Sequence, residues 1–189
     1  MATLSQNVTI AARNINQFRS FFNGSITHLD IPKGTTAVRN YAFYYYSGLA
    51  SVCFPNSLKS IGNFSFERCN SLAEVILPEG FTTFGHGSFY NCPGITDLTI
   101  PSTVQSFGQN VFFGCSSMVN VTIADGFNAS GLDLSPSTRY TAETIVSWLN
   151  ALADRTGQTA YTLTIGSTNL AKLTAEEIAI ATNKNWNLA

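Results

Sequence analysis

The sequence predicts a right-handed solenoid, a stack of similar short coils with helical or mixed capping segments at both ends. Three observations lead to this prediction: a 23-residue periodicity without insertions, alternating apolar and polar residues early in each period, and a proline at one fixed place in each. Repetition at a period of about 20–50 residues is typical of solenoids, in which each repeat buries apolar side chains against its neighbours. We therefore expect mainly short β-strands and irregular turns.

The segment before the first repeat, residues 1–25, is predicted to form an N-terminal cap. Ile15, Phe18 and Phe22 have the spacing of one helical face within residues 11–22. Gly24 follows, as glycine commonly does after a helix. We expect this short helix to cover the open side of the first coil.

Four complete repeats are predicted over residues 26–48, 49–71, 72–94 and 95–117, and a partial fifth extends the repeat region to residue 134. The first, fourth and sixth positions are apolar, and the fourth and sixth alternate with polar neighbours, which predicts a short strand with one buried face. The sixth position is expected to form one internal row of Ile31, Phe54, Leu77 and Ile100. A proline at the seventh position then ends each strand, because proline cannot donate a backbone hydrogen bond.

The second half of each repeat has apolar columns of its own. The thirteenth position is apolar in all four copies, and the eighteenth is always phenylalanine, at Phe43, Phe66, Phe89 and Phe112. A repeat of this length is too short for a strand and a long helix, so we expect a second short strand or a tight turn. One copy cannot bury these side chains alone, and stacking is required for stability.

The last segment, residues 135–189, is predicted to continue the solenoid and to close its core. Four elements are expected there: a helix over residues 142–155, a strand over 161–165, a helix from Thr174 to about Thr182, and a strand over 186–188. Gly157 is expected to end the first helix. Thr174 and Glu177 have the spacing of a capping box, which is typical of a helix N-terminus.

Charged residues make up only 11% of the chain and the net charge is −1, with both signs scattered along the sequence. A nucleic-acid-binding surface or an anionic-membrane contact would need clustered basic residues, so neither partner is expected. No apolar stretch approaches the roughly 20 residues of a transmembrane helix, and the N-terminus lacks the pattern of a signal peptide. We expect no membrane insertion and favour a monomer.

Three of the four cysteines form one column of the repeat, at Cys69, Cys92 and Cys115. We expect them to be buried reduced thiols, with a disulfide between neighbouring coils or a metal site as alternatives. Cys53 lies in an outward strand position and is expected to be exposed. His28 and His86 have no acid, cysteine or serine partner at motif spacing, so no catalytic residue, metal ligand or cofactor is predicted.

Two surfaces are candidates for binding a partner. The strand face, formed by outward positions of the strands, is represented by His28, Asp30, Ser51, Glu74, Asp97 and Asn120. The aromatic ridge, which precedes the cysteine column, consists of Tyr44, Tyr45, Tyr90 and Phe113. Tyrosine offers a large contact area at a low entropy cost, which favours a protein or glycan contact on the ridge. The alternatives are a plain solvated strand face and packing of Tyr44 and Tyr45 against the N-terminal cap.

The pattern L-x-x-V-x-I-P, followed by I-G-x-x-x-F and a cysteine at period 23, resembles the BspA-type leucine-rich repeat. The resemblance covers residues 26 to about 127. The first repeat departs from it, because Tyr46 replaces the cysteine, Arg39 the glycine and Thr35 an apolar residue, as expected of an edge coil beside a cap. The family occurs in surface proteins of oral and gut bacteria and of some protozoa. The resemblance thus implies an extracellular or cell-surface, adhesion-type module of bacterial origin.

The residues and the resemblance together predict a non-catalytic scaffold that presents its repeat surface to a protein or a glycan. The alternative is a structural or assembly module of a surface fibre or a phage-like appendage. An enzyme is not expected, since no acid–base, nucleophile or metal pattern is present. A deep pocket that gathers His28 with two acidic residues would revive that class, whereas a smooth shallow sheet would argue against it.

Overall fold

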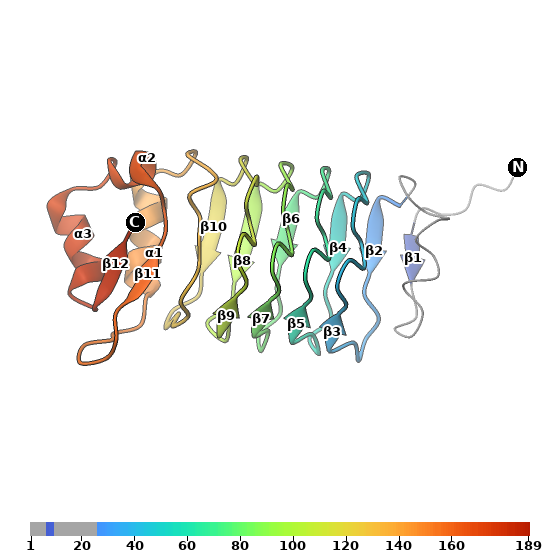
Figure 1. Cartoon of the computed structure of the whole chain (residues 1–189), viewed down its shortest axis with the longest axis horizontal. Coiled ribbons are helices and arrows are strands. Elements are labelled where there is room, and N and C mark those ends of the chain that lie inside the picture. The colour runs from blue at the N-terminus through green and yellow to red at the C-terminus, as the bar shows by residue number, and fades with distance from the viewer. Residues whose placement is uncertain (1–6, 10–25) are drawn as a thin grey trace, which may run out of the picture.

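The computed structural model describes residues 7–9 and 26–189, so the helix predicted over residues 11–22 lies outside the described part of the chain. In the described part, short parallel strands and turns form coils that lie side by side in sequence order along the long axis (Figure 1). Helices occur only near the C-terminal end of the described residues.

The first row of strands comes from the beginning of each coil. It comprises β1 (Asn7–Thr9), β2 (His28–Asp30), β4 (Ser51–Cys53), β6 (Glu74–Ile76), β8 (Asp97–Ile100) and β10 (Asn120–Ile123). They pair in parallel as two three-stranded sheets, β1–β2–β4 and β6–β8–β10. His28 lies opposite Ser51 and Glu74 opposite Asp97, so equivalent positions of neighbouring coils are direct partners. The sequence did not predict β1, which adds a strand within residues 1–25.

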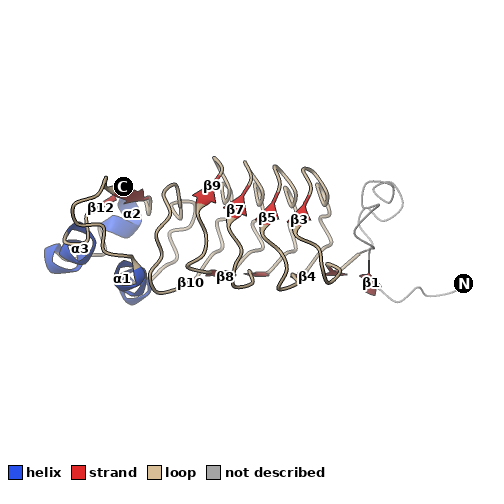
Figure 2. Cartoon of the chain, turned by 90° about the horizontal axis from the view of Figure 1, so that it is seen from below, coloured by secondary structure: helices blue, strands red, loops and turns tan. Residues whose placement is uncertain are grey.

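The second row of strands supplies the return path of each coil. It is a four-stranded parallel sheet of β3 (Ala37–Val38), β5 (Ser60–Ile61), β7 (Thr83–Phe84) and β9 (Ser106–Phe107). Figure 2 shows the two rows on different sides of the coils. The apolar side chains of the first three of these strands, Val38, Ile61 and Phe84, are buried between the rows, whereas Phe107 of β9 is only partly buried.

The core between the rows is a set of stacked apolar columns. The phenylalanine column is buried as predicted, and the rings of Phe43, Phe66 and Phe89 stack with centroid separations of 5.0 and 5.2 Å. Ile31, Leu77 and Ile100 are buried in the predicted row, whereas Phe54 is only partly buried and meets the edge of Phe66. The rings of the phenylalanine column therefore stack on their equivalents in the next coil, and rings of other columns pack against their edges.

The turns are held by backbone hydrogen bonds of two kinds. After the strand, the proline carbonyl accepts from the residue three positions on, as Pro55 does from the Leu58 N–H at 2.9 Å. Proline thus begins the turn as well as ending the strand. Before the next strand, alternate N–H groups donate to the following coil, as Phe43 does to the Ser65 carbonyl at 2.7 Å. These segments are fixed to their neighbours although they are not strands.

Five further elements follow the repeats. They are α1 (Ala142–Ala151), β11 (Tyr161–Leu163), α2 (Ser167–Leu170), α3 (Ala175–Thr182) and β12 (Trp186–Leu188). The capping box of Thr174 and Glu177 is present at the start of α3, and β11 pairs with β12 in parallel. α1 packs against β10, where the buried Trp148 donates its ring N–H to the Val121 carbonyl at 2.8 Å.

Two expectations for this region need correction. The helix predicted over residues 142–155 ends at Ala151, because Leu152 adopts an extended backbone (φ −61°, ψ 136°) and bridges Phe127. The sequence also missed α2, a single turn after Gly166. None of the described helices is long and apolar enough to cross a lipid bilayer.

Candidate functional site

The aromatic ridge lies on the turn that leads from the second strand of one coil to the first strand of the next. Phe113 is 51% exposed and Tyr45 is 38% exposed, while Tyr44 and Tyr90 are partly buried. Neighbouring rings are in contact: Tyr44 meets Tyr45 at 4.5 Å between centroids, and Tyr90 stacks on Phe113 at 5.0 Å. The turn therefore presents joined aromatic surface rather than isolated rings.

Two aromatic residues that the sequence analysis missed extend this ridge. Tyr41 is 45% exposed and stacks on the partly buried Phe64 at 5.4 Å between centroids. Tyr41 also meets the edge of Tyr44 at 5.9 Å, and the Arg68 guanidinium lies 4.8 Å over the Tyr45 ring. We call the ridge with Tyr41 and Phe64 the extended ridge. Both residues occupy the sixteenth position of their repeats, and this shared column was the signal that could have found them.

The backbone of the extended ridge is unfavourable for the side chains it carries. Tyr41, Tyr45 and Phe64 have φ values of 57°, 65° and 52°, in the left-handed region. In the last two complete repeats the same columns hold the residues that tolerate this region best, at Gly87, Asn91, Asn110 and Gly114, whereas the second repeat also carries Arg68 there, at φ 59°. A bulky residue there costs about 1–2 kcal/mol relative to glycine. Folding alone would favour glycine or asparagine at these positions in all copies.

The strand face consists of two hydrogen-bonded polar clusters with an exposed segment between them. Asp97 accepts from the Thr96 hydroxyl at 2.5 Å and from the Asn120 amide at 2.8 Å, and these two bonds lower the pKa of its carboxyl group. Glu74 and Ile76 lie in the preceding coil, between the two clusters, and Ile76 is 54% exposed. The predicted strand face is therefore not one continuous polar surface, because exposed residues separate its two clusters.

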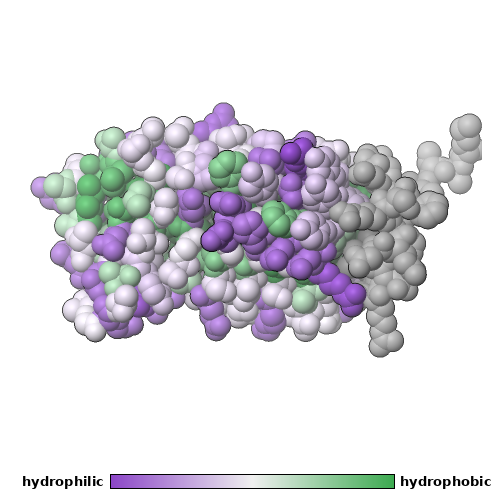
Figure 3. Space-filling view, in the orientation of Figure 1, coloured by the Kyte–Doolittle hydropathy of each residue, from purple (hydrophilic) through white to green (hydrophobic). Residues whose placement is uncertain are grey.

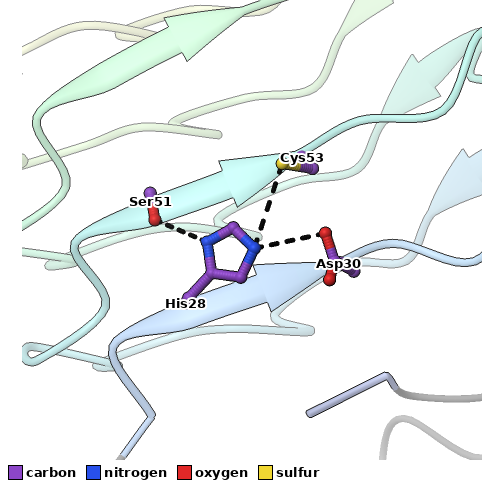
Figure 4. Close-up of polar contacts among 4 residues, drawn as sticks. All are labelled: His28, Asp30, Ser51 and Cys53. Carbon is purple, nitrogen blue, oxygen red and sulfur yellow. Dashed lines mark hydrogen bonds and ion pairs between the residues drawn. The ribbon is translucent and has the colours of Figure 1, made fainter. Parts of the chain in front are cut away.

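The other cluster surrounds His28 (Figure 4). Its Nδ1 lies 2.6 Å from the Ser51 hydroxyl, and its Nε2 lies 3.2 Å from the Asp30 carboxylate and 4.0 Å from the Cys53 sulfur. The expectation that His28 has no such partner was wrong. That expectation rested on spacing along the chain, whereas parallel pairing places the third and fifth positions of one coil beside those of the next.

The His28 cluster has the residue types of a hydrolase but not its surroundings. Ser51, His28 and Asp30 form a chain of contacts, yet they lie on a sheet surface and are each only partly buried. Asp30 and Cys53 line a shallow open depression together with Lys33 and Pro55. Activation of a nucleophile depends on a water-excluded, preorganised site. Burial and the neighbouring Asp30 carboxyl also raise the pKa of the Cys53 thiol, which makes it a weaker nucleophile at neutral pH.

The cysteine column belongs to the core. All three of its cysteines are free and buried, and each thiol faces a carbonyl oxygen of the preceding coil. The acceptors are Phe43, Phe66 and Phe89, at S···O distances of 3.3, 2.9 and 3.2 Å. Burial raises the pKa of Cys69 to about 12. Cys53, in contrast, is free and exposed, as predicted.

This difference in exposure predicts the thiol chemistry of the folded protein. A colorimetric thiol reagent is expected to modify Cys53 in the native chain and to reach the other three cysteines only in denaturant, because Cys53 is exposed and the column is buried. The raised pKa of Cys53 should make its reaction slower than that of an ordinary exposed thiol. The Cys53→Ser variant is the control and should leave no thiol that reacts in the native chain. Native labelling of that variant would contradict the burial of the column.

The face shown in Figure 3 has a mixed character. Over the coils, small apolar areas alternate with polar ones, and the broadest apolar area lies over the C-terminal elements around α2 and α3. Leu170, Leu173 and Ile180 are partly buried apolar residues of that region. Charged residues make up only 11% of the sequence, and the net charge is −1.

The sequence profile of the BspA type leucine rich repeat region matches residues 13–132 in six copies. The match covers more than half of the chain and begins within the segment predicted as the N-terminal cap. No curated protein matches the chain.

Solved structures similar to this chain include three bacterial proteins. A leucine-rich repeat protein of T. pallidum is 23% identical, and the match covers 61% of this chain and 50% of that chain with a TM-score of 0.51. A leucine-rich repeat protein of Bacteroides ovatus is 21% identical, with 82% of this chain and 37% of that chain covered and a TM-score of 0.53. A leucine rich cell surface protein of Faecalibacterium prausnitzii is 23% identical, with 68% of this chain and 35% of that chain covered and a TM-score of 0.41. The first two support a leucine-rich repeat fold. The chain spans half or less of the length of each of these proteins.

Proposed function

This chain belongs to the BspA-type leucine-rich repeat family, and from that premise we propose that it is a non-catalytic scaffold that binds a protein or glycan partner through the extended ridge. Repeats of this kind typically serve as interaction scaffolds. We also propose that it acts at a bacterial surface in an adhesion-type role, which the family resemblance favours. The proposal concerns the part of a protein that this sequence represents.

The observation that carries the proposal is the placement of large aromatic rings at left-handed backbone positions. Tyr41, Tyr45 and Phe64 stand where the last two complete repeats carry glycine or asparagine. A residue that lowers stability and exposes apolar area has a simple explanation if it contacts a partner, since aromatic residues dominate binding energy at interfaces. The strand face also exposes an apolar side chain, Ile76 at 54%, but Ile76 stands in the regular strand β6 and not at a left-handed position.

The backbone of the extended ridge is suited to binding because it is already fixed. The N–H groups of Tyr41 and Tyr45 donate to the carbonyls of Asn63 and Glu67 at 2.9 and 2.8 Å, and Arg68 donates to Tyr90 at 2.9 Å. Ring contacts between neighbours limit side-chain motion as well. A preorganised surface loses less conformational entropy when a partner binds, which favours affinity.

The proposal is tested by separating binding from folding. The full chain is first screened on an array of glycans and extracellular matrix proteins, and the strongest hit is measured by surface plasmon resonance. The triple variant Tyr45→Asn, Tyr90→Ser, Phe113→Ser is expected to bind that hit at least tenfold more weakly, a loss of about 1.4 kcal/mol. Its melting temperature should be unchanged or higher, because asparagine tolerates the left-handed angle at residue 45 better than tyrosine.

A variant of the strand face, Glu74→Gln with Asp97→Asn, is the matched control and should bind like the unmodified chain. If the control loses binding and the ridge variant does not, the ridge is not the binding surface. If no glycan or protein on the array binds the unmodified chain, the adhesion role is contradicted. A large fall in the melting temperature of the ridge variant would instead assign these rings to the core.

A further inference from the structure

Three side chains with metal-binding atoms converge on the strand face at β2 and β4. The ring nitrogen of His28, a carboxylate oxygen of Asp30 and the sulfur of Cys53 all lie within 4.8 Å of one another. Nε2 of His28 is 3.2 Å from Asp30 and 4.0 Å from Cys53 (Figure 4). Ligands in a tetrahedral zinc site lie about 3.3–3.8 Å apart, as metal–ligand distances of about 2.0–2.3 Å require. Small side-chain rotations suffice to reach that spacing.

The backbone holds these side chains on one face without strain. His28 and Asp30 are two residues apart on β2, and alternate residues of a strand share a face. In-register pairing with β4 sets Ser51 beside His28 and Cys53 beside Asp30. The convergence therefore follows from the main fold of the first two described coils and does not depend on a loop.

Ser51 orients the imidazole ring. Its hydroxyl lies 2.6 Å from Nδ1 of His28, on the side of the ring away from Asp30 and Cys53. Metal-binding histidines usually have their second ring nitrogen in a hydrogen bond of this kind, which fixes the ring and leaves the first nitrogen for the ion. Ser51 is thus a positioning residue and not a ligand.

We propose that His28, Asp30 and Cys53 form a binding site for a zinc-class divalent cation. Nitrogen, oxygen and thiolate sulfur together suit Zn²⁺ and related late transition ions, whereas Mg²⁺ and Ca²⁺ prefer oxygen ligands alone. Three protein ligands leave one coordination position open to water or to a group of a bound partner. That position faces solvent beside the shallow depression that Asp30, Lys33 and Cys53 line.

The site is specific to these coils. The equivalent third and fifth positions hold Glu74 and Ile76 in the next coil, and then Asp97 and Thr99. Neither pair supplies a nitrogen or sulfur ligand, so the repeat architecture by itself does not produce the cluster. A coil with the residues of the later copies at these positions would not bind the ion.

Binding is a displacement of a proton by the metal. The S–H bond of Cys53 breaks, a metal–sulfur bond forms, and the proton leaves to solvent. The thiol of the free protein holds its proton because burial and the Asp30 carboxyl disfavour a nearby thiolate. A dication removes that repulsion by binding both anions at once.

The test uses the full chain, reduced and free of metal, titrated with Zn²⁺ against a chromophoric chelator. We expect one Zn²⁺ per chain, and Co²⁺ should give the near-ultraviolet absorption band of a thiolate–cobalt bond. Cys53→Ser and His28→Ala should weaken binding by at least about 100-fold and abolish that band, and Ser51→Ala should weaken it by about 10–100-fold. Asp97→Asn, which removes a carboxylate elsewhere on the strand face, is the matched control and should bind as the unmodified chain does.

The proposal is overturned if Zn²⁺ does not compete with the chelator, or if Cys53→Ser binds with unchanged affinity. A cobalt spectrum without the thiolate band would also refute the assignment of Cys53. Thermal melts of the metal-free variants show whether a lost affinity reflects a lost fold, and Cys53→Ser is the decisive variant because its side chain is exposed. None of these variants touches the extended ridge, so the result is independent of the array experiment.

Discussion

Replacing Phe89 by alanine is expected to lower the free energy of unfolding by about 3–5 kcal/mol. Phe89 is 0% exposed and lies in the middle of the phenylalanine column, 5.2 Å from the Phe66 ring and 6.0 Å from the Phe112 ring. Its edge also meets Phe84 at 6.3 Å. Truncation leaves a cavity in the column. The neighbouring rings of Phe66 and Phe112 cannot move to fill it, because backbone hydrogen bonds between the coils hold their backbone segments in place.

The matched control is Phe113→Ala, which removes the same side chain from the exposed turn. Its effect on stability is expected to stay below about 1 kcal/mol, because a largely solvated ring loses little packing. Urea denaturation followed by circular dichroism measures both. A change below 1 kcal/mol for Phe89→Ala would contradict the assignment of the column to the core.

Replacing Gly85 by alanine is expected to destabilise the fold by about 3 kcal/mol, at the upper end of the usual range for overpacking. An added Cβ would lie 2.5 Å from the carbonyl carbon of Gly62 and 2.6 Å from the amide nitrogen of Asn63. Both atoms belong to the backbone of the preceding coil, which cannot rotate away as a side chain can. The two coils would have to separate at this point.

Gly126→Ala serves as the control for this substitution. A Cβ at Gly126 meets no atom within 4 Å, and only its φ of 80° opposes alanine, which costs about 1 kcal/mol. Gly85 is not in the left-handed region, so its loss of stability reports the contact between coils, whereas that of Gly126→Ala reports the backbone angle alone. Equal effects would mean that the coils are less tightly stacked than the structure shows.

Most of the repeat region could be predicted because its structure depends on patterns that are visible along the sequence. The strand at residues 28–30 follows from alternating polarity, and the buried Phe89 follows from a column of identical residues. The helix over residues 142–155 was overestimated at its C-terminal end, since a pairing partner at Phe127, distant in sequence, draws Leu152 out of the helix. Local helix signals carry no information about such a partner.

The candidate sites could be predicted only in part. The exposure of Tyr45 and Phe113 was predicted from their positions just before the cysteine column. Tyr41 and Phe64 were not predicted, because their place beside the ridge follows from ring contacts that form only in the folded turn. The sequence predicted no site at His28, because two of its three partners, Ser51 and Cys53, are more than twenty positions away along the chain. Aligning the repeats and reading outward positions across neighbouring copies would have revealed that cluster.

The sequence by itself determined the period of the chain, the residues that face the core, and the family to which the chain belongs. These properties depend on the order and polarity of side chains, which are one-dimensional. Only the tertiary structure decided which side chains of neighbouring coils touch, why Gly85 admits no Cβ, and which exposed rings occupy left-handed positions. Those outcomes depend on the register between coils and on backbone angles at the turns, and both are set when the coils stack.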